Sequence, residues 1–280
     1  MTQNANPLQG WFRQPAIYIR LPSQGQYWPE GSLSMPANQE LPVRAMTALD
    51  EINYRTPDAL FNGQAVVEVI QSCIPNILDA WHTPATDINS ILISIRIASY
   101  GHEMEINSTC PKCSETNDYS LDMRVMLQNM PLPNYQEGLK IGEIECFFQP
   151  MSFRQQTQVS MDQYETQRLI AAAQDEKVPE PERVKVMTGV MKKINEVTTR
   201  AMTFGIAGIR SPGGFVDNHD HIREFLTNCD SRTYQQIRDH AVQLRAGSEV
   251  RPVTLTCAGC QNPYEQSIEL NMSNFFAAAS

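Results

Sequence analysis

Two short cysteine pairs that lie far apart in the chain constrain its fold more than any other feature. Cys110 and Cys113 form one CxxC pair, and Cys257 and Cys260 form the other. Each pair lies between two stretches that favour β-strand, so we expect each at the tip of a hairpin. Two such knuckles can supply four thiolates to one tetrahedral zinc ion, and a site closed by four thiolates has no open position for water or substrate. The spacing therefore predicts one structural Zn2+ bound by these four cysteines.

Other uses of the cysteines stay open. One CxxC pair can be a redox dithiol, but neither pair has the strand-to-helix setting of a thioredoxin-like motif. Two disulfides would need an oxidising compartment. The first residues show no basic region followed by an apolar run, so we expect no secretory signal and a reducing compartment. The single cysteines Cys73, Cys146 and Cys229 are expected to be small buried hydrophobic residues.

Composition excludes several classes of protein. A chain of 280 residues with 41% hydrophobic and 19% charged residues is long and apolar enough for one sizeable core, with or without a satellite module. The net charge of −9 argues against nucleic-acid binding, which needs a positively charged surface. Apolar stretches stay well below the length of about 18 residues that a membrane span requires. We expect neither nucleic acid nor a membrane as partner.

Apolar periodicity and Pro/Gly punctuation divide the chain into five predicted parts. These are an extended N-terminal arm over 1–40, a helical core region over 41–101, a first knuckle ribbon and strand over 102–150, an inserted helical module over 152–248, and a second knuckle ribbon and tail over 249–280. If both knuckles bind one metal, the helical module is an insertion between two halves of one zinc ribbon. The predicted fold class is therefore α+β: a helical body with a four-cysteine zinc-ribbon β module and an inserted helical block.

The arm is too irregular to form its own core. One short strand is expected over 16–21, and the rest should pack through Trp11, Tyr27 and Trp28 on other subunits or on the outer face of the body. Deleting residues 1–14 is then expected to impair assembly more than folding.

Two helices are predicted in the core region. One begins near Thr56, passes through Gly63 and ends near Cys73. The other begins near Thr83–Pro84 or Thr86–Asp87, buries one face and ends at a Gly101 cap. Its Arg96 is expected to hold its charge in solvent, with burial beside Asp50 or Glu51 as the alternative.

Four further helices are predicted in the inserted module, over 155–174, 184–209, 219–228 and 231–246, the last capped by Asp230 or Ser231. A strand over 141–148 precedes them. The internal seam of the second helix is expected from apolar residues at helical spacing: Met187, Val190, Met191, Ile194 and Val197.

Catalytic signatures give no positive support for an enzyme. The one cluster of imidazole and acid is His219-Asp220-His221, where Asp217 and Asp220 are expected to be helix caps and a second metal is the alternative. The chain has no phosphate-binding glycine loop, nucleophile elbow or Ser/His/Asp arrangement. We therefore expect no catalytic residues and no enzyme activity.

An ordered series of short segments between Ile19 and Met123 matches a known family. The segments are 21–27, 41–47, 50–51, 57–63, 67–75, 87–88, 95–101 and 110–113. Over this stretch, somewhat more than a third of the chain, it resembles the baseplate hub subunit family of T-even-type contractile-tailed bacteriophages. The helical block at 152–248 lies outside the resemblance.

The resemblance implies a structural subunit of the phage tail baseplate, in the hub or tail tip, that acts by protein–protein assembly. Its partners would be other phage tail and baseplate proteins, with a homo-oligomer of ring symmetry as a further option. It would be assembled in the host cytoplasm and located in the virion. The alternatives are a baseplate assembly chaperone absent from the mature virion, a zinc-ribbon regulatory protein that binds nucleic acid, and a metallo-hydrolase that uses His219 or His221.

Overall fold

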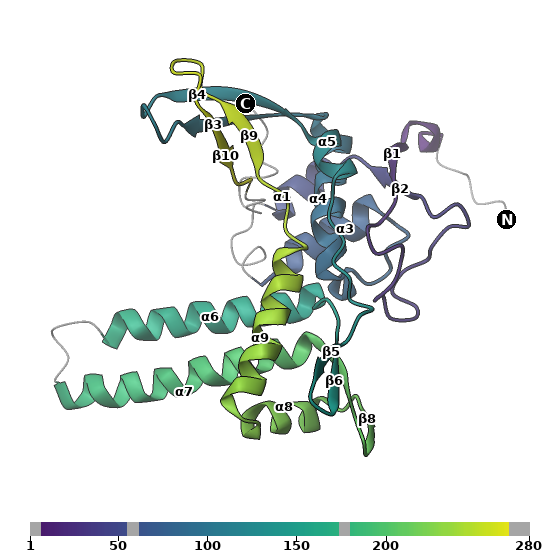
Figure 1. The fold of residues 1–280 in the computed structure, drawn as a ribbon. Helices are drawn as coiled ribbons and strands as arrows, with labels where there is room; N and C mark the ends of the chain where they lie inside the picture. Colours follow the sequence, from purple (N-terminus) through teal and green to yellow (C-terminus); the bar gives the residue numbers. More distant parts are fainter. Residues whose placement is uncertain (1–6, 55–61, 174–179, 269–280) are drawn as a thin grey trace.

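The computed structural model describes residues 7–54, 62–173 and 180–268. Figure 1 shows a helical body flanked by the N-terminal strands, two β-ribbons at one end of it, and a long helical hairpin with a small sheet and two further helices at the other end. The sheets are small and antiparallel, and four cysteines cluster between the ribbons. The predicted α+β fold class is confirmed.

The helices of the described chain, in order, are η1 Gln9–Trp11, α1 Ala48–Tyr54, α3 Gln64–Cys73, η2 Ala80–His82, α4 Ala85–Tyr100, α5 Met123–Gln128, α6 Phe153–Ala173, α7 Glu180–Phe204, α8 His219–Asn228 and α9 Ser231–Ala246. The strands are β1 Pro15–Ile19, β2 Leu41–Arg44, β3 Glu103–Thr109, β4 Thr116–Asp122, β5 Leu139–Ile141, β6 Ile144–Phe148, β7 Ile206–Ser211, β8 Gly214–Val216, β9 Val253–Thr256 and β10 Pro263–Gln266.

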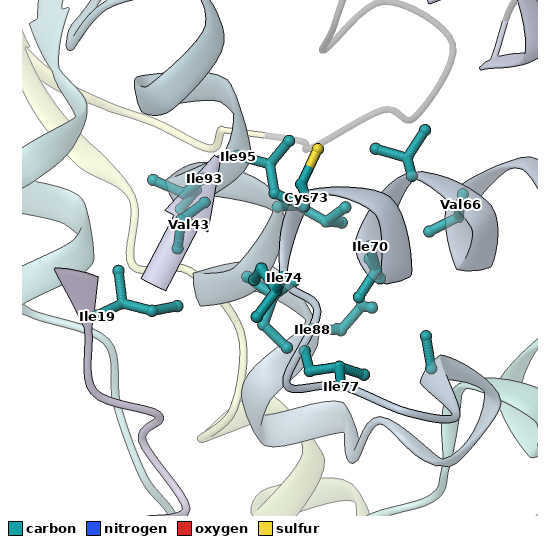
Figure 2. Close-up of a cluster of buried hydrophobic side chains, with 14 of the residues drawn as sticks. Ile19, Val43, Val66, Ile70, Cys73, Ile74, Ile77, Ile88, Ile93 and Ile95 are labelled. Atoms are coloured by element: carbon teal, nitrogen blue, oxygen red, sulfur yellow. The ribbon is translucent and has the colours of Figure 1, made fainter. Parts of the chain in front are cut away.

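Helix α4 lies at the centre of the main core. It begins and ends where predicted, with Gly101 as its C-terminal cap. The expectation of one buried face is wrong, because eleven of its sixteen residues are buried. The helix contacts β1, β2, α3, α5 and α6, which surround it on several sides. Figure 2 shows side chains from this core, among them Ile19, Ile70 and Ile93, together with the buried Cys73.

Helix α3 packs beside α4 and ends at Cys73 as predicted. Its start is different, because Gly63 has a left-handed backbone with φ of 78°. Such a residue cannot continue a right-handed helix, so the prediction of a helix running through Gly63 is wrong. The predicted start near Thr56 lies outside the described residues.

The N-terminal arm contributes to the main core. Strand β1 pairs antiparallel with β2, and Ile19 and Leu21 are buried with residues of α3 and α4. The short strand was predicted, but the expectation that the arm only covers the body or reaches neighbours is wrong for this part.

A buried carboxylate fixes the next part of the arm. Asp87, in the first turn of α4, accepts hydrogen bonds from the Ser23 backbone N–H at 2.9 Å and from Trp28 Nε1 at 2.8 Å. Burial raises the pKa of Asp87, while the hydrogen bonds from Ser23 and Trp28 oppose that rise. Tyr27 meets Tyr135 edge-on at 5.7 Å. Tyr27 and Trp28 therefore pack on the body.

Arg13 anchors the start of the arm. Its guanidinium donates to the Ala45 carbonyl and to the Ser72 carbonyl, each at 2.7 Å, and forms an ion pair with Asp50 at 3.2 Å. Arg13 is thus the basic partner of Asp50. The expectation of a solvated Arg96 is wrong, since Arg96 is only 5% exposed and lies over the Tyr100 ring at 5.4 Å.

Helices α6 and α7 form an antiparallel hairpin that extends from the body (Figure 1). Lys193 pairs with Glu165 at 2.5 Å and Arg200 with Asp162 at 2.7 Å along one side of the hairpin. The predicted seam is partly correct. Val190 and Val197 are buried and Met187 and Ile194 are half-buried, but Met191 is exposed.

The inserted block also contains strands. Helix α7 ends at Phe204, not at Ile209, because Ile206–Ser211 form β7. This strand pairs with β6 across about 60 residues of sequence, completing a sheet in the order β5-β6-β7-β8. The 211–214 segment is the β7–β8 turn and does not separate two helices as predicted.

Helices α8 and α9 cover a second core that includes Cys146, Ile206, Ile222 and Ile237. Both helices have the bounds predicted for them, and Asp230 caps α9. Cys146 is buried as predicted and Cys229 is half-buried. The division of the chain into five parts stays a prediction. The sheet β5-β6-β7-β8 takes strands from both sides of the predicted boundary at residues 150–152.

Candidate metal centre

Two antiparallel ribbons carry the cysteine pairs. In the first, β3 and β4 pair in register from Glu103↔Asp122 to Thr109↔Thr116. In the second, β9 and β10 pair from Val253↔Gln266 to Thr256↔Pro263. Each CxxC pair follows the first strand of its ribbon, at the tip. The sequence prediction of two hairpin knuckles is confirmed.

Both tips adopt the same turn. In the first, the Cys110 N–H donates to the Glu115 carbonyl at 2.9 Å, and the Ser114 N–H donates to the Cys110 carbonyl at 2.9 Å. In the second, the Cys257 N–H donates to the Asn262 carbonyl at 3.1 Å, and the Gln261 N–H donates to the Cys257 carbonyl at 3.0 Å. Ser114 and Gln261 both have positive φ, 60° and 57°. This turn brings the two sulfurs of each pair to one side.

The four sulfurs converge. All four Sγ atoms lie within 4.8 Å of one another. Cys110 and Cys260 are 3.7 Å apart, and Cys113 and Cys257 are 3.5 Å apart, although these partners are 150 and 144 residues apart in sequence. A tetrahedron of sulfurs around zinc, with Zn–S near 2.3 Å, has edges of about 3.8 Å. The donor set and its spacing therefore fit a four-thiolate metal site.

Backbone N–H groups favour the thiolate form that a metal requires. The Cys260 backbone N–H lowers the pKa of Cys257 to about 6, with a further contribution from the N–H of Gly259. Burial raises the pKa of Cys110, but hydrogen bonds from the backbone N–H groups of Cys113 and Lys112 act in the opposite direction. The net result is a lowered pKa.

Cys113 shows the opposite balance. The Glu115 backbone N–H lowers its pKa, but hydrogen bonding to the sulfurs of Cys260 and Cys257 raises it more strongly, to about 12. A fourth thiolate is thus unfavourable among the other sulfurs. A divalent cation would remove that penalty, because it attracts all four thiolates at once.

Polar side chains between the ribbons hold the knuckles together. Tyr264 Oη donates to Ser108 Oγ at 3.0 Å, and Ser108 Oγ donates to Gln266 Oε1 at 2.7 Å. Tyr119 Oη donates to the Thr256 carbonyl at 3.1 Å. Sequence reasoning did not single out these residues. The sequence could have pointed to them only through the alternation of the strands, in which their side chains are the more buried ones between exposed neighbours.

Gly259 lies at the contact between the two knuckles. A Cβ at this position would collide with the carboxylate of Glu115 in the other knuckle. Because this carboxylate is the end of an exposed, flexible side chain, a Cβ at position 259 would displace it without separating the two tips.

The second candidate, around His219 and His221, forms no comparable cluster. Among the described residues, only the four cysteines bring three or more metal-ligating side chains together. His219 and His221 lie in the first turn of α8, whose N-cap is Asn218, accepting from the backbone N–H groups of Asp220 and His221. The prediction that Asp217 or Asp220 caps this helix is wrong.

Comparison with known proteins gives one family. A family model described as T4 bacteriophage base plate protein matches residues 29–201, more than half of the chain. The match covers most of the main core, the first knuckle ribbon and nearly all of the α6–α7 hairpin, so on its C-terminal side it extends beyond the segments that carry the sequence resemblance. Strand β1 and the second knuckle lie outside it. No curated protein and no solved structure matches the chain significantly.

Proposed function

The chain belongs to the T4 bacteriophage base plate protein family, and from this premise we propose that it is a structural subunit of the hub or tail tip. The family match over residues 29–201 is the observation that carries the proposal. In this role the protein acts by binding its neighbours and performs no catalysis. It would be assembled in the host cytoplasm and stay in the virion.

The proposal includes a structural Zn2+ held by Cys110, Cys113, Cys257 and Cys260. The sulfur spacing, the identical turns and the lowered pKa of Cys257 support it. Such an ion would join two knuckles between which the whole inserted block lies. Structural zinc contributes its binding free energy to folding, so it would fix both ends of the insertion to one small base.

The surface of the first ribbon argues against nucleic acid as the partner. Glu103 and Glu105 are exposed on one face of β3, and Asp118 is exposed on the same face of β4. Acidic side chains along an exposed ribbon repel phosphate groups. No helix among the described residues has the length and apolarity needed to cross a membrane. Other tail and base plate proteins are therefore the proposed partners, with a homo-oligomer of ring symmetry as the finer possibility.

The α6–α7 hairpin is the proposed contact for those neighbours. Val184 and Met191, two turns apart on α7, are 61% and 54% exposed. Apolar side chains repeated on one helix face are typical of a surface that a partner covers. Protection of this hairpin from protease in assembled particles, but not in the purified chain, would support the contact.

Mass spectrometry of gradient-purified mature tails tests the function. A structural subunit would be present at a fixed ratio to other base plate proteins in every tail fraction. Presence in infected-cell lysate with absence from mature tails would contradict the proposal and indicate an assembly chaperone.

A further inference from the structure

Two large aromatic residues stand exposed at the start of the arm. Trp11 is 87% exposed and Phe12 is 55% exposed. The next residue, Arg13, is fixed to the body by its hydrogen bonds to Ala45 and Ser72. This pair, here called the aromatic hook, is therefore held in place while its side chains remain in solvent.

A groove lies along the same strand. Its volume is about 630 Å3, and it runs between β1 and α5. Its wall on the β1 side is the continuous run 17–22, followed by Gln24, and its opposite wall includes Ile97, Leu127 and Met130. The last three residues of β1, Ile17 to Ile19, line the groove together with the three residues that follow the strand. Neighbouring residues of a strand point to opposite faces, so a groove lined by consecutive ones follows the edge of β1 that does not pair with β2. Open strand edges beside apolar grooves accept extended segments.

Charge at the rim favours an uncharged occupant. The two arginines of the rim are already paired within the chain, Arg20 with Glu40 at 3.1 Å and Arg124 with Asp122 at 2.7 Å. The groove therefore does not demand an acidic partner. The hook is aromatic and uncharged, and it fits the apolar part of the lining, which includes Ile97, Leu127 and Met130.

The hook does not fill the groove of its own chain. It precedes β1, whereas the groove extends beyond the other end of the strand to Gln24. The high exposure of Trp11 shows that it lies outside any such pocket. Two β1 strands that run antiparallel about a two-fold axis, however, place the N-terminal end of each at the C-terminal end of the other. Each hook then reaches the groove of the other copy.

The buried area favours this reciprocal arrangement. At these exposures, the two aromatic side chains present about 300 Å2 together. One hook in one groove would bury about 600 Å2 in total, which is typical of weak lattice contacts. Two reciprocal contacts would bury about 1,200 Å2, the lower bound for a specific interface.

We propose that the face formed by Trp11, Phe12, β1 and α5 is a self-association surface, where the hook of each copy occupies the groove of a second copy about a two-fold axis. This goes beyond the proposed function. Self-association is a property of the purified chain, so its failure would leave incorporation into base plates untouched.

Sedimentation equilibrium of the purified full-length chain tests the proposal. The natural chain should form dimers and no larger species. Trp11→Ala should raise the dimer dissociation constant at least about 100-fold, because each dimer loses two buried aromatic anchors. Gln128→Trp, which fills the groove from α5, should have the same effect, and Trp11→Phe should be intermediate. The control is Phe215→Ala on β8, a residue as exposed as Phe12 but distant from the groove.

Three results would overturn the proposal. The first is a natural chain that stays monomeric up to about 100 μM. The second is a dimer that Trp11→Ala weakens no more than Phe215→Ala does. The third is growth of open oligomers beyond the dimer, which would indicate a head-to-tail contact instead of a two-fold one. Unchanged melting temperatures of the variants, measured at a concentration at which all chains are monomeric, would show that the effects do not come from unfolding.

Discussion

Replacing Arg13 by alanine should destabilise the protein far more than any change at the exposed residues beside it. The guanidinium makes three hydrogen bonds of 2.7 Å, to the Ala45 carbonyl, the Ser72 carbonyl and Ser72 Oγ, besides its ion pair with Asp50. Hydrogen bonds from a charged donor contribute about 1.5–3 kcal/mol each when well buried.

The loss is smaller than the sum of these contributions. The Arg13 side chain is 26% exposed, so water replaces part of what is removed. Asp50 also keeps the Thr47 N–H at 2.7 Å and Thr47 Oγ1 at 2.8 Å as donors. We expect Arg13→Ala to lower the free energy of unfolding by about 3 kcal/mol. In a chain of this size that corresponds to a fall in melting temperature of about 6–10 °C.

Urea titration and calorimetry measure both quantities. Arg13→Lys should lose about half as much, since an ammonium can keep the ion pair with Asp50 but cannot reach both carbonyls with a planar fork. Trp11→Ala is the matched control, measured at a concentration at which all chains are monomeric, with an expected change below about 0.5 kcal/mol. An Arg13→Ala chain as stable as this control would refute the anchoring role. Deleting residues 1–14 would remove Arg13 and its contacts with the body. Deleting residues 1–12 would leave this anchor in place.

Three further changes test other parts of the structure. Cys257→Ser should reduce zinc content and increase amide exchange in both ribbons, because structural zinc contributes directly to folding; full zinc content with unchanged exchange would contradict the shared site. Asp87→Ala should cost about 2–4 kcal/mol in urea denaturation, since the Ser23 N–H and Trp28 Nε1 lose their buried acceptor; a cost below about 1 kcal/mol would mean that water takes its place. Gly63→Ala should cost about 1–2 kcal/mol more than Gly31→Ala. Both glycines have φ near 80°, but a Cβ at Gly63 would meet Phe153 at 3.1 Å and Thr157 at 3.0 Å, whereas a Cβ at Gly31 would meet nothing. Equal melting temperatures of the two variants would show that the close contact between the start of α3 and α6 does not matter for stability.

Local features of the sequence predicted local structure well. A CxxC turn depends on a few adjacent residues, so both knuckles could be placed from the sequence, and tetrahedral chemistry then predicted that they meet. The bounds of α9 were correct for the same reason, since Asp230 and the residues around it form the cap by themselves.

Long-range partners explain what the sequence did not reveal. Residues 206–209 continue the apolar pattern of a helix, yet they form β7 because β6 offers them a strand to pair with. The sequence offered Arg96 as a possible partner of Asp50, and only the packing of the arm against α1 and α3 makes Arg13 the partner instead. The full burial of α4 likewise depends on neighbours from five elements, which its own periodicity cannot show.

Zinc X-ray absorption of the purified full-length chain tests the joined knuckles most directly. With metal analysis beside it, we expect about one zinc ion per chain, coordinated by four sulfurs at about 2.3 Å. Cys113→Ser and Cys260→Ser, one from each knuckle, should each reduce the sulfur count or the zinc content. A chain with no bound zinc, or zinc bound by only two sulfurs together with nitrogen or oxygen, would contradict a single site shared by the two ribbons.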